Sequence, residues 1–589
     1  MNFGRTFFAS LLAVIVGFGL VVMLWTMVVV GMVASFGSSP SVVVARGSVL
    51  QLDLGAMTDS PAVSPLDGFD FQRMEVVPRM TLLKTLQAVQ AAAADDRIEG
   101  IYIRLGESAS ASLASLEEVR AELERFKESG KFVVAYQEAY SQLAYWFASV
   151  ADEVYTNPAG GMEWKGLSST LIFYKGLFDK LGVEPVVIRH GSFKSAVEPY
   201  ILDRMSPENR LQYEKMTGAL WGMVLEQVSA SRDIPVADLQ AFADGLTIDS
   251  PAAAVANGLI DDLRYEDQVT DRLAELAGTA EGEEPGIVSL GDYATQVSAP
   301  NPSAKNKIAV IYAEGTIVSG SGARGEVGSD PMVEKIRRAR EDEDAVAVVL
   351  RINSPGGSAL ASEVMWRELE LLKAEKPLIV SMGALAASGG YYIAAPADAI
   401  YANRATLTGS IGVFGLFYNV GGALKDKLGV TTDVVNTGRY ADLGSAYRSP
   451  SSAELAYIQT SVEDVYTTFV GHVAEGRNMT PEAVDNIGQG RVWAGDDALE
   501  IGLIDGFGGL AEAVSLAADR VGVSGDFRIW EVTAEPSPLD ALLGGLSASI
   551  RTRIMKDELG PLYNQYQNIR NVLNEGGIQA RMPFAVDIQ

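Results

Sequence analysis

The segment Asp179-Lys180-Leu181-Gly182-Val183 recurs 247 residues later as Asp426-Lys427-Leu428-Gly429-Val430. The same offset relates Arg104 to Arg351, and each arginine ends or nearly ends an apolar run. Solenoid repeats have periods of about 20 to 50 residues, so a period this long indicates two copies of a whole domain. At 589 residues the chain is also too long for one hydrophobic core. The sequence therefore predicts two related domains in tandem.

The second copy shows the pattern of a parallel α/β domain. Residues 345–352 form a continuous apolar run, residues 362–374 have helical periodicity, and residues 377–382 are apolar again. A strand, a helix and a second strand in this order predict a parallel sheet with a crossover helix. The expected fold class is therefore α/β, in two tandem copies.

Composition divides the chain further. Residues 278–306 are rich in Gly, Pro, Ser, Ala and Glu, which is typical of a flexible linker. The last 53 residues have no counterpart in the first copy, and within them residues 557–573 are helix-like, as in an arm for packing or oligomerisation. The expected divisions are residues 1–40 (amino terminus and anchor), 41–277 (first domain), 278–306 (linker), 307–536 (second domain) and 537–589 (carboxy-terminal extension).

The overall charge and residue usage exclude several kinds of function. A formal charge of −28 argues against phosphate-backbone binding, which needs clustered Lys and Arg, so we expect no nucleic-acid partner. The chain has no cysteine and only two histidines, which excludes disulfides, thiolate chemistry and a histidine-rich zinc site. Residues 320–325 match G-x-G-x-x-G but are not followed by an apolar helix, so we interpret them as a loop. We expect neither a metal nor a cofactor.

The amino terminus predicts a membrane anchor. No charged residue occurs between Arg5 and Arg46, and residues 7–36 are almost wholly apolar. About 20 apolar residues cross a bilayer, whereas the apolar part of a cleaved signal peptide usually has about 7 to 15. Arg5 and the α-amino group favour a cytoplasmic amino terminus, with the domains on the extracytoplasmic side.

Ser388 is the first candidate for a catalytic group. It lies in Ala386-Ala387-Ser388-Gly389-Gly390, between a predicted strand and the short apolar helical segment 391–395. Small neighbours permit a sharp turn, and a helix start offers free N–H groups to an oxyanion. The alternative is an ordinary helix N-cap, for which serine is equally suited.

A glycine-rich turn strengthens the case for Ser388. Residues 353–358, Asn-Ser-Pro-Gly-Gly-Ser, follow the apolar strand 345–352, at the strand end where α/β sheets place their sites. Aligning Tyr155 with Tyr401 puts Gln142 at the Ser388 position, so the first copy lacks both features. This difference indicates function more than a structural turn.

A serine nucleophile needs a base. His190 ends an apolar run and His472 lies in an amphipathic helix, so both are better interpreted as structural. A buried lysine can serve instead, because burial lowers its pKa from about 10.4 toward neutrality. From the residues alone, Lys194, Lys175 and Lys425 remain candidates.

The chain resembles the long, duplicated form of the signal peptide peptidase family, also called protease IV, over essentially its whole length. The resemblance rests on Phe193-Lys194-Ser195-Ala196-Val197-Glu198-Pro199, the turn 353–357, residues 387–391 and Leu407-Thr408-Gly409-Ser410-Ile411-Gly412. It implies two domains of the Clp protease/crotonase type with a site where they meet.

The family resemblance also implies roles for individual residues. Ser388 would be the nucleophile, Lys194 the general base and Ser410 the residue that orients the lysine, while the amides of Gly357 and Gly389 would form the oxyanion hole. The expected protein is a membrane-anchored serine endopeptidase that degrades hydrophobic peptides such as released signal peptides, without a cofactor. The resemblance implies a homo-oligomer, specifically a homotetramer.

Two other functions remain open from the sequence. A membrane-tethered scaffold or adaptor could use the same fold for assembly without hydrolysis. Acyl-CoA chemistry, as in crotonases, uses similar glycine turns but does not explain a serine between small residues or the expected extracytoplasmic location of the domains.

Overall fold

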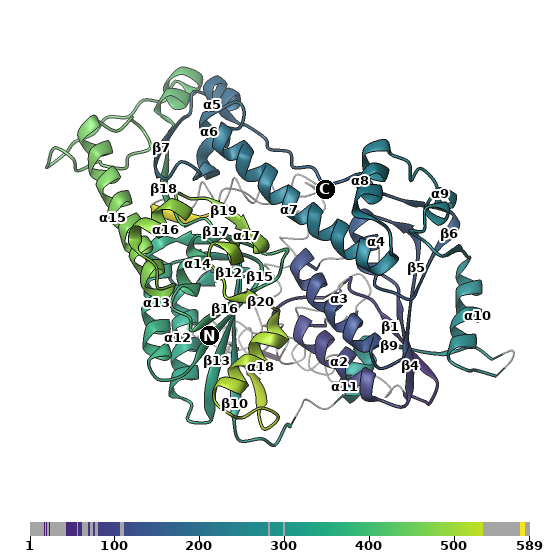
Figure 1. The fold of residues 1–589 in the computed structure, drawn as a ribbon. Coiled ribbons are helices and arrows are strands. Elements are labelled where there is room, and N and C mark those ends of the chain that lie inside the picture. The colour runs from purple at the N-terminus through teal and green to yellow at the C-terminus, as the bar shows by residue number, and fades with distance from the viewer. Residues whose placement is uncertain are drawn as a thin grey trace, which may run out of the picture.

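A computed structural model describes residues 17, 19, 20, 23, 43–55, 57–61, 69–70, 75–76, 80–105, 111–280, 283–297, 301–533 and 578–582. The two halves of the chain each contain a β-sheet flanked by helices, and they lie side by side (Figure 1). A third sheet combines strands from both halves. The site described below lies where this third sheet meets the sheet of the second half.

The sheet of the first half is parallel throughout, in the order β8-β6-β5-β4-β1-β9. Most of β4 and the first half of β5 are apolar and buried, as expected for a sheet covered on both faces. The strands are β1 (Ser48–Leu52), β4 (Ile98–Ile103), β5 (Phe132–Tyr140), β6 (Glu153–Met162), β8 (Asp262–Leu263) and β9 (Gly286–Ser289). The helices are α2 (Leu82–Ala94), α3 (Leu113–Lys127), α4 (Gln142–Ala148), α8 (Val236–Gly245), α9 (Pro251–Ala256), α10 (Glu266–Leu276) and α11 (Leu290–Gln296). A separate hairpin pairs β2 (Phe69–Asp70) with β3 (Glu75–Val76).

The sheet of the second half has the order β19-β17-β15-β13-β10-β21, with β16 and β20 branching from β15. The parallel path β20-β16-β15-β13-β10-β21 repeats the plan of the first half, whereas β19 is antiparallel to β17. The predicted strand, helix and strand over 345–382 are confirmed as β13, α13 and β15, and the two strands are parallel. The strands are β10 (Lys307–Glu314), β13 (Ala345–Ser354), β15 (Leu378–Ala387), β16 (Ala399–Ala402), β17 (Leu407–Gly409), β19 (Val492–Ala494), β20 (Gly506–Phe507) and β21 (Arg528–Glu531). The helices are α12 (Ser329–Glu341), α13 (Ala359–Lys373), α14 (Gly389–Ala394), α15 (Ser452–Gly476), α16 (Pro481–Ile487), α17 (Gly495–Glu500) and α18 (Leu510–Arg520), with a π-turn at Ala423–Lys427.

The segment predicted to be a flexible linker contains regular structure. Within 278–306, β9 extends the first-half sheet beside β1, and α11 follows it directly. Leu290 and Tyr293 are buried, and the Tyr293 hydroxyl donates to Asp95 Oδ2 at 3.1 Å. The burial of residues such as Leu290 and Tyr293 therefore stabilises a strand and a helix here, although the composition is that of a flexible linker.

A strand of the first half is built into the second half. β7 (Glu184–His190) pairs antiparallel with β18 (Val413–Asn419) along its whole length, from Glu184 opposite Asn419 to His190 opposite Val413. Figure 1 shows β7 with α5 (Lys175–Leu181) and α6 (Glu198–Ile201) over the second half, and α7 (Pro207–Arg232) running back toward the first. The rest of this sheet has the order β12 (Glu326–Gly328), β11 (Thr316–Val318), β14 (Gly356–Ser358), β22 (Ile578–Arg581) and then β18.

A buried ion cluster joins the two halves. Arg351 of β13 is 1% exposed and contacts two carboxylates of the first half, Glu118 Oε1 at 2.7 Å and Asp59 Oδ2 at 3.1 Å. Glu118 also accepts from the backbone of Leu510 at 2.7 Å and from Asn403 Nδ2 at 2.9 Å. Burial opposes the charge on Arg351, but the two carboxylates raise its pKa above the ordinary value. The cluster therefore joins β13 of the second half to two carboxylates of the first half through buried ion pairs.

Among the residues that the structure describes, no helix has the length and apolar character to span a bilayer. The predicted anchor, residues 7–36, lies outside the described residues apart from 17, 19, 20 and 23. The helix predicted over 557–573 also lies outside them.

Replacing Arg351 by methionine tests the ion cluster. The Arg351→Met variant leaves Glu118 and Asp59 buried without a counter-charge, so the free energy of unfolding should fall by about 3–5 kcal/mol. The control is Arg104→Met, because Arg104 is the repeat counterpart but is 27% exposed and pairs with the surface Glu266. That change should cost only about 0–1 kcal/mol. Urea denaturation measures both, and equal losses would contradict a special role for the buried cluster.

Candidate active site

Ser388 lies at a strained turn between β15 and α14. Its φ and ψ are 56° and −114°, a conformation that L residues rarely adopt, and its hydroxyl makes no capping hydrogen bond to the helix. The backbone N–H of Ser388 donates to Gly409 O at 2.7 Å, which ties the turn to the end of β17. The turn thus frees the hydroxyl for another partner, unlike an ordinary N-cap.

The first half contains the ordinary version of this turn. Ser141 separates β5 from α4, has φ and ψ of −68° and 159°, and accepts from Ala144 N at 3.3 Å as a normal N-cap. The helix starts therefore align Ser141 with Ser388, and the predicted alignment with Gln142 is wrong by one residue. Gln142 instead accepts from the backbone of Lys165 and Gly166.

The partner of Ser388 is Lys194 of the first half. Its Nζ lies 2.9 Å from Ser388 Oγ, 3.0 Å from Ser410 Oγ and 3.0 Å from Ser410 O. The sequence alone left Lys175 and Lys425 open, but Lys175 pairs with Asp179 on the surface and Lys425 is exposed. The structure therefore brings together Ser388, Lys194 and Ser410 within one chain.

The surroundings of Lys194 disfavour its charged form. The side chain is completely buried, and among the described residues no carboxylate forms an ion pair with it. Burial therefore lowers the pKa of the Lys194 ammonium well below the usual lysine range. A neutral amine at hydrogen-bond distance from a hydroxyl can accept the hydroxyl proton.

Several contacts hold the backbone of Lys194 in place. Arg189 Nη1 of β7 donates to the Lys194 carbonyl at 3.1 Å. The fully buried Glu198 accepts from Ser206 N, Ser206 Oγ and Asn209 Nδ2 at 3.1, 2.6 and 2.9 Å, which fastens the segment after Lys194 to the start of α7. On the other side, a Cβ at Gly490 would lie 2.7 Å from Lys194 Cβ, so this position needs a glycine.

The glycine-rich turn meets the start of α14 beside Ser388. Gly357 belongs to β14, and Gly389 is the first residue of α14. Gly356, which precedes Gly357, lies close to Gly389, because a Cβ on Gly356 would be 2.6 Å from Gly389 N. The two amides expected to form an oxyanion hole thus belong to backbone segments in direct contact. A further strand, β22, pairs with this turn, and no pattern in the sequence predicts it.

The other candidates lie elsewhere. His190 Nδ1 contacts Glu463 Oε2 at 2.5 Å and its ring stacks on Tyr466, while His472 contacts Glu363 and stacks on Trp366. Both histidines thus have partners other than the site. The G-x-G-x-x-G segment is an exposed loop that leads into β12. Among the described residues no group of three or more potential metal ligands occurs.

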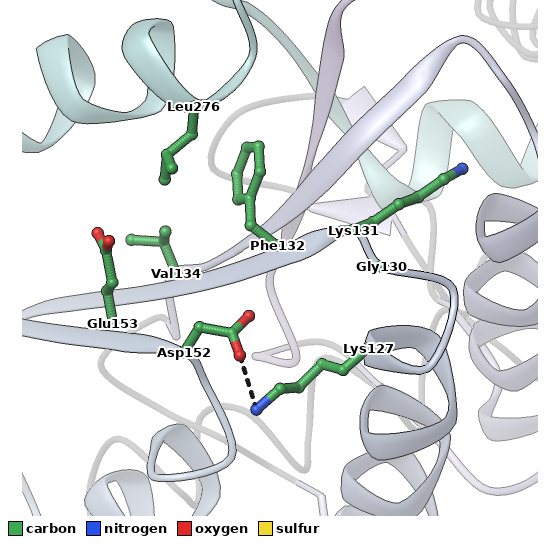
Figure 2. A pocket seen from close by; sticks show the side chains of 8 residues that line it. All are labelled: Lys127, Gly130, Lys131, Phe132, Val134, Asp152, Glu153 and Leu276. Atoms are coloured by element: carbon green, nitrogen blue, oxygen red, sulfur yellow. Dashed lines mark ion pairs between the residues drawn. The ribbon is translucent and has the colours of Figure 1, made fainter.

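A cavity of about 320 Å³ opens in the first half, away from Ser388 (Figure 2). It is lined by Lys127, Gly130, Lys131, Phe132, Val134, Asp152, Glu153 and Leu276. Figure 2 shows Lys127 directed toward Asp152, with which it forms an ion pair of 2.9 Å. The cavity contains none of the predicted site residues.

Comparison with known proteins gives several matches. The chain is 36% identical over 489 residues to "Protease 4" of Haemophilus influenzae, covering 80% of this chain and 78% of that one. It is 37% identical over 527 residues to "Protease 4" of Salmonella typhi, covering 87% and 84%. The solved structure of a ClpP1 variant from Listeria monocytogenes aligns with a TM-score of 0.24 and 9% identity, over 36% of this chain and 95% of that one, which is too weak to support any conclusion.

Two segments, residues 125–280 and 370–524, match Peptidase family S49, one in each half of the chain. The duplication inferred from the sequence is thus also a duplication of the family domain. Together with the relatives over most of its length, these matches show that the chain is a serine peptidase and belongs to peptidase family S49.

Proposed function

We propose that this protein hydrolyses peptides with a Ser388/Lys194 dyad. The observation that supports this is the 2.9 Å contact between Lys194 Nζ and Ser388 Oγ in a fully buried setting. Neutral Lys194 takes the hydroxyl proton while Ser388 Oγ attacks the substrate carbonyl carbon. The amides of Gly357 and Gly389 stabilise the oxyanion.

The same lysine completes the reaction. Protonated Lys194 gives its proton to the leaving amine, so the peptide bond breaks and an ester remains on Ser388. Lys194, neutral again, takes a proton from a water molecule that attacks the ester carbonyl carbon. The ester bond then breaks, Lys194 returns that proton to Ser388 Oγ, and the acid leaves with the serine hydroxyl restored. Ser410 keeps the amine directed at Ser388 through its contacts with Nζ.

The proposed substrates are hydrophobic peptides in extended form, such as released signal peptides. Support comes from an apolar cluster next to the nucleophile, in which Ala387 packs with Met216, Leu407 and Val492. The proposal also includes the Clp protease/crotonase type of fold for both halves, which the parallel sheets and the glycine-rich turn favour.

We expect the dyad residues to be indispensable. Ser388→Ala and Lys194→Ala should each lower kcat/KM for a fluorogenic hydrophobic peptide by about 10⁴-fold or more, because either change removes covalent catalysis. Lys175→Ala and Lys425→Ala serve as matched controls and should retain activity, since both side chains lie on the surface. Turnover that survives both dyad changes, or is absent from the parent protein, would contradict the dyad and favour the scaffold function.

The pH profile should report the depressed pKa of Lys194. Protonated Lys194 cannot act as a base, so kcat/KM should rise with pH as Lys194 loses its proton. Because burial lowers that pKa, the midpoint should lie well below about 10.4, the ordinary lysine value. Steady-state kinetics across pH test this, with Lys175→Ala as the control for an unchanged profile. A rise centred near the ordinary lysine value would contradict the account.

The proposed location is the cytoplasmic membrane, with a single crossing and the catalytic halves on the extracytoplasmic side. Support is the uncharged stretch between Arg5 and Arg46. The full chain should stay with membranes through an alkaline wash, and a chain that begins at residue 43 should be released. Full-length protein in the soluble fraction would overturn the proposed anchor.

We also propose a homo-oligomer, in accord with the homotetramer that the family resemblance implies. In the second half, the segment that follows the repeated Asp-Lys-Leu-Gly-Val forms no strand and exposes Val434 and Val435, at 50% and 95%. The equivalent segment of the first half is β7, which is paired. Two adjacent exposed valines in a segment without strand pairing fit a contact with another copy. Light scattering coupled to gel filtration measures the number of copies.

A further inference from the structure

We propose that β22 is a built-in peptide ligand that competes with substrate for the cleft between the edges of β14 and β18 beside the dyad. β22 lies between β14 and β18 and is antiparallel to both. On one side Gly357 is opposite Ala580, and on the other Phe414 is opposite Gln579. Pairing with exposed strand edges is how many proteins hold extended peptides. The two edges that β22 occupies are those next to the dyad.

The register of β22 places one carbonyl group at the proposed oxyanion hole. Met582 N donates to Pro355 O at 2.6 Å, and hydrogen-bonded pairs alternate along an antiparallel ladder. Two residues further along, Gly357 and Ala580 are therefore also a hydrogen-bonded pair, in which the Gly357 N–H faces the Ala580 oxygen.

Close approaches at two other glycines support the same position. A Cβ on Gly356 would lie 2.3 Å from the Ala580 oxygen, and one on Gly389 would lie 3.0 Å from it. The Ala580 oxygen is thus enclosed by backbone of both segments that contain the proposed oxyanion donors. Ala580 takes the place of the substrate residue whose carbonyl carbon is attacked, and Arg581 and Met582 lie on the leaving side.

The side chains of the segment are buried as those of a bound peptide would be. Ala580 is completely buried, and Met582 is 2% exposed. Met582 packs against Met216 of the first half and against Leu407 and Val492 of the second. The cleft is therefore suited to an extended peptide with a small residue at the attacked position and an apolar residue two positions later.

Cysteine protection tests occupancy without any turnover. The chain has no cysteine, so a single Met582→Cys change in the Ser388→Ala background gives one reporter. Its thiol should react with a water-soluble disulfide reagent at least about 100-fold more slowly than that of Val435→Cys, an exposed control, because modification requires the strand to leave the cleft. Adding Ala580→Arg, which the buried position cannot hold, should raise the rate toward the control. Equal rates for the Met582→Cys and Val435→Cys proteins would overturn the proposal.

Competition is measured on the active full-length chain. Ala580→Arg should raise kcat/KM for the fluorogenic peptide about tenfold with kcat unchanged, because a larger fraction of the protein then has an open cleft. Asn574→Arg, which adds the same charge six residues earlier, is the matched control and should behave like the parent. Equal kcat/KM in all three proteins would overturn competition.

The competitive effect rests on the proposed peptidase chemistry, but occupancy does not. If none of the three proteins hydrolyses the peptide, the proposed function fails, and the protection of Met582→Cys still decides whether β22 occupies the cleft. The two measurements therefore distinguish an error in the proposed occupancy by β22 from an error in the proposed peptidase function.

Discussion

The contact between Lys194 Nζ and Ser388 Oγ depends on the pairing of β7 with β18. The two residues are 194 positions apart, and this antiparallel pairing brings the lysine of the first half to the serine of the second. Burial lowers the pKa of the Lys194 ammonium, because the charged form loses its contact with water. Removing an ammonium from water costs about 1.4 kcal/mol for each unit by which its pKa falls. Other interactions in the fold must offset that free energy. The hydrogen bonds of Arg189 and Glu198, which hold the segment around the lysine, contribute to this.

Corresponding residues in the two duplicated halves have different roles. Ser141 and Ser388 occupy the same place before a helix, yet one is an ordinary N-cap, and the other has a positive φ and a side chain that contacts Lys194 instead of capping the helix. Arg104 and Arg351 show the same divergence, because one pairs at the surface while the other joins the halves through buried carboxylates. The same residue type thus has a different role in each half, because its contacts differ: Ser141 caps a helix, whereas Ser388 contacts Lys194.

Much of the architecture could be predicted, because local patterns of apolar and small residues indicate the strands, helices and turns. The apolar run that forms β13 and the helical period of α13 predict a parallel sheet, and the small residues around Ser388 predict a sharp turn. The choice of Lys194 could not be derived from the residues alone, because it depends on strand pairing between distant segments. The family resemblance supplied it, and the structure places that lysine beside the serine.

Other features were missed for physical reasons. Polar composition concealed β9 and α11, whose few buried residues suffice to hold them. The strand β22 is only four residues long and forms by pairing with the edges of β14 and β18. Its own sequence is too short to show a periodic pattern. The alignment of Gln142 with Ser388 is wrong by one residue, because it relies on Tyr155 and Tyr401. The number of residues between the helix and that tyrosine differs by one between the two halves.

The most direct test of the account is the rate at which a serine-directed phosphonate modifies the protein, followed by intact mass and peptide mapping. The account predicts a single adduct on Ser388 in the parent protein, and modification slower by about 10³-fold or more in a Lys194→Met variant, because the hydroxyl then lacks its base. Equal rates in the two proteins, or an adduct on another residue, would contradict the claim that Lys194 activates Ser388.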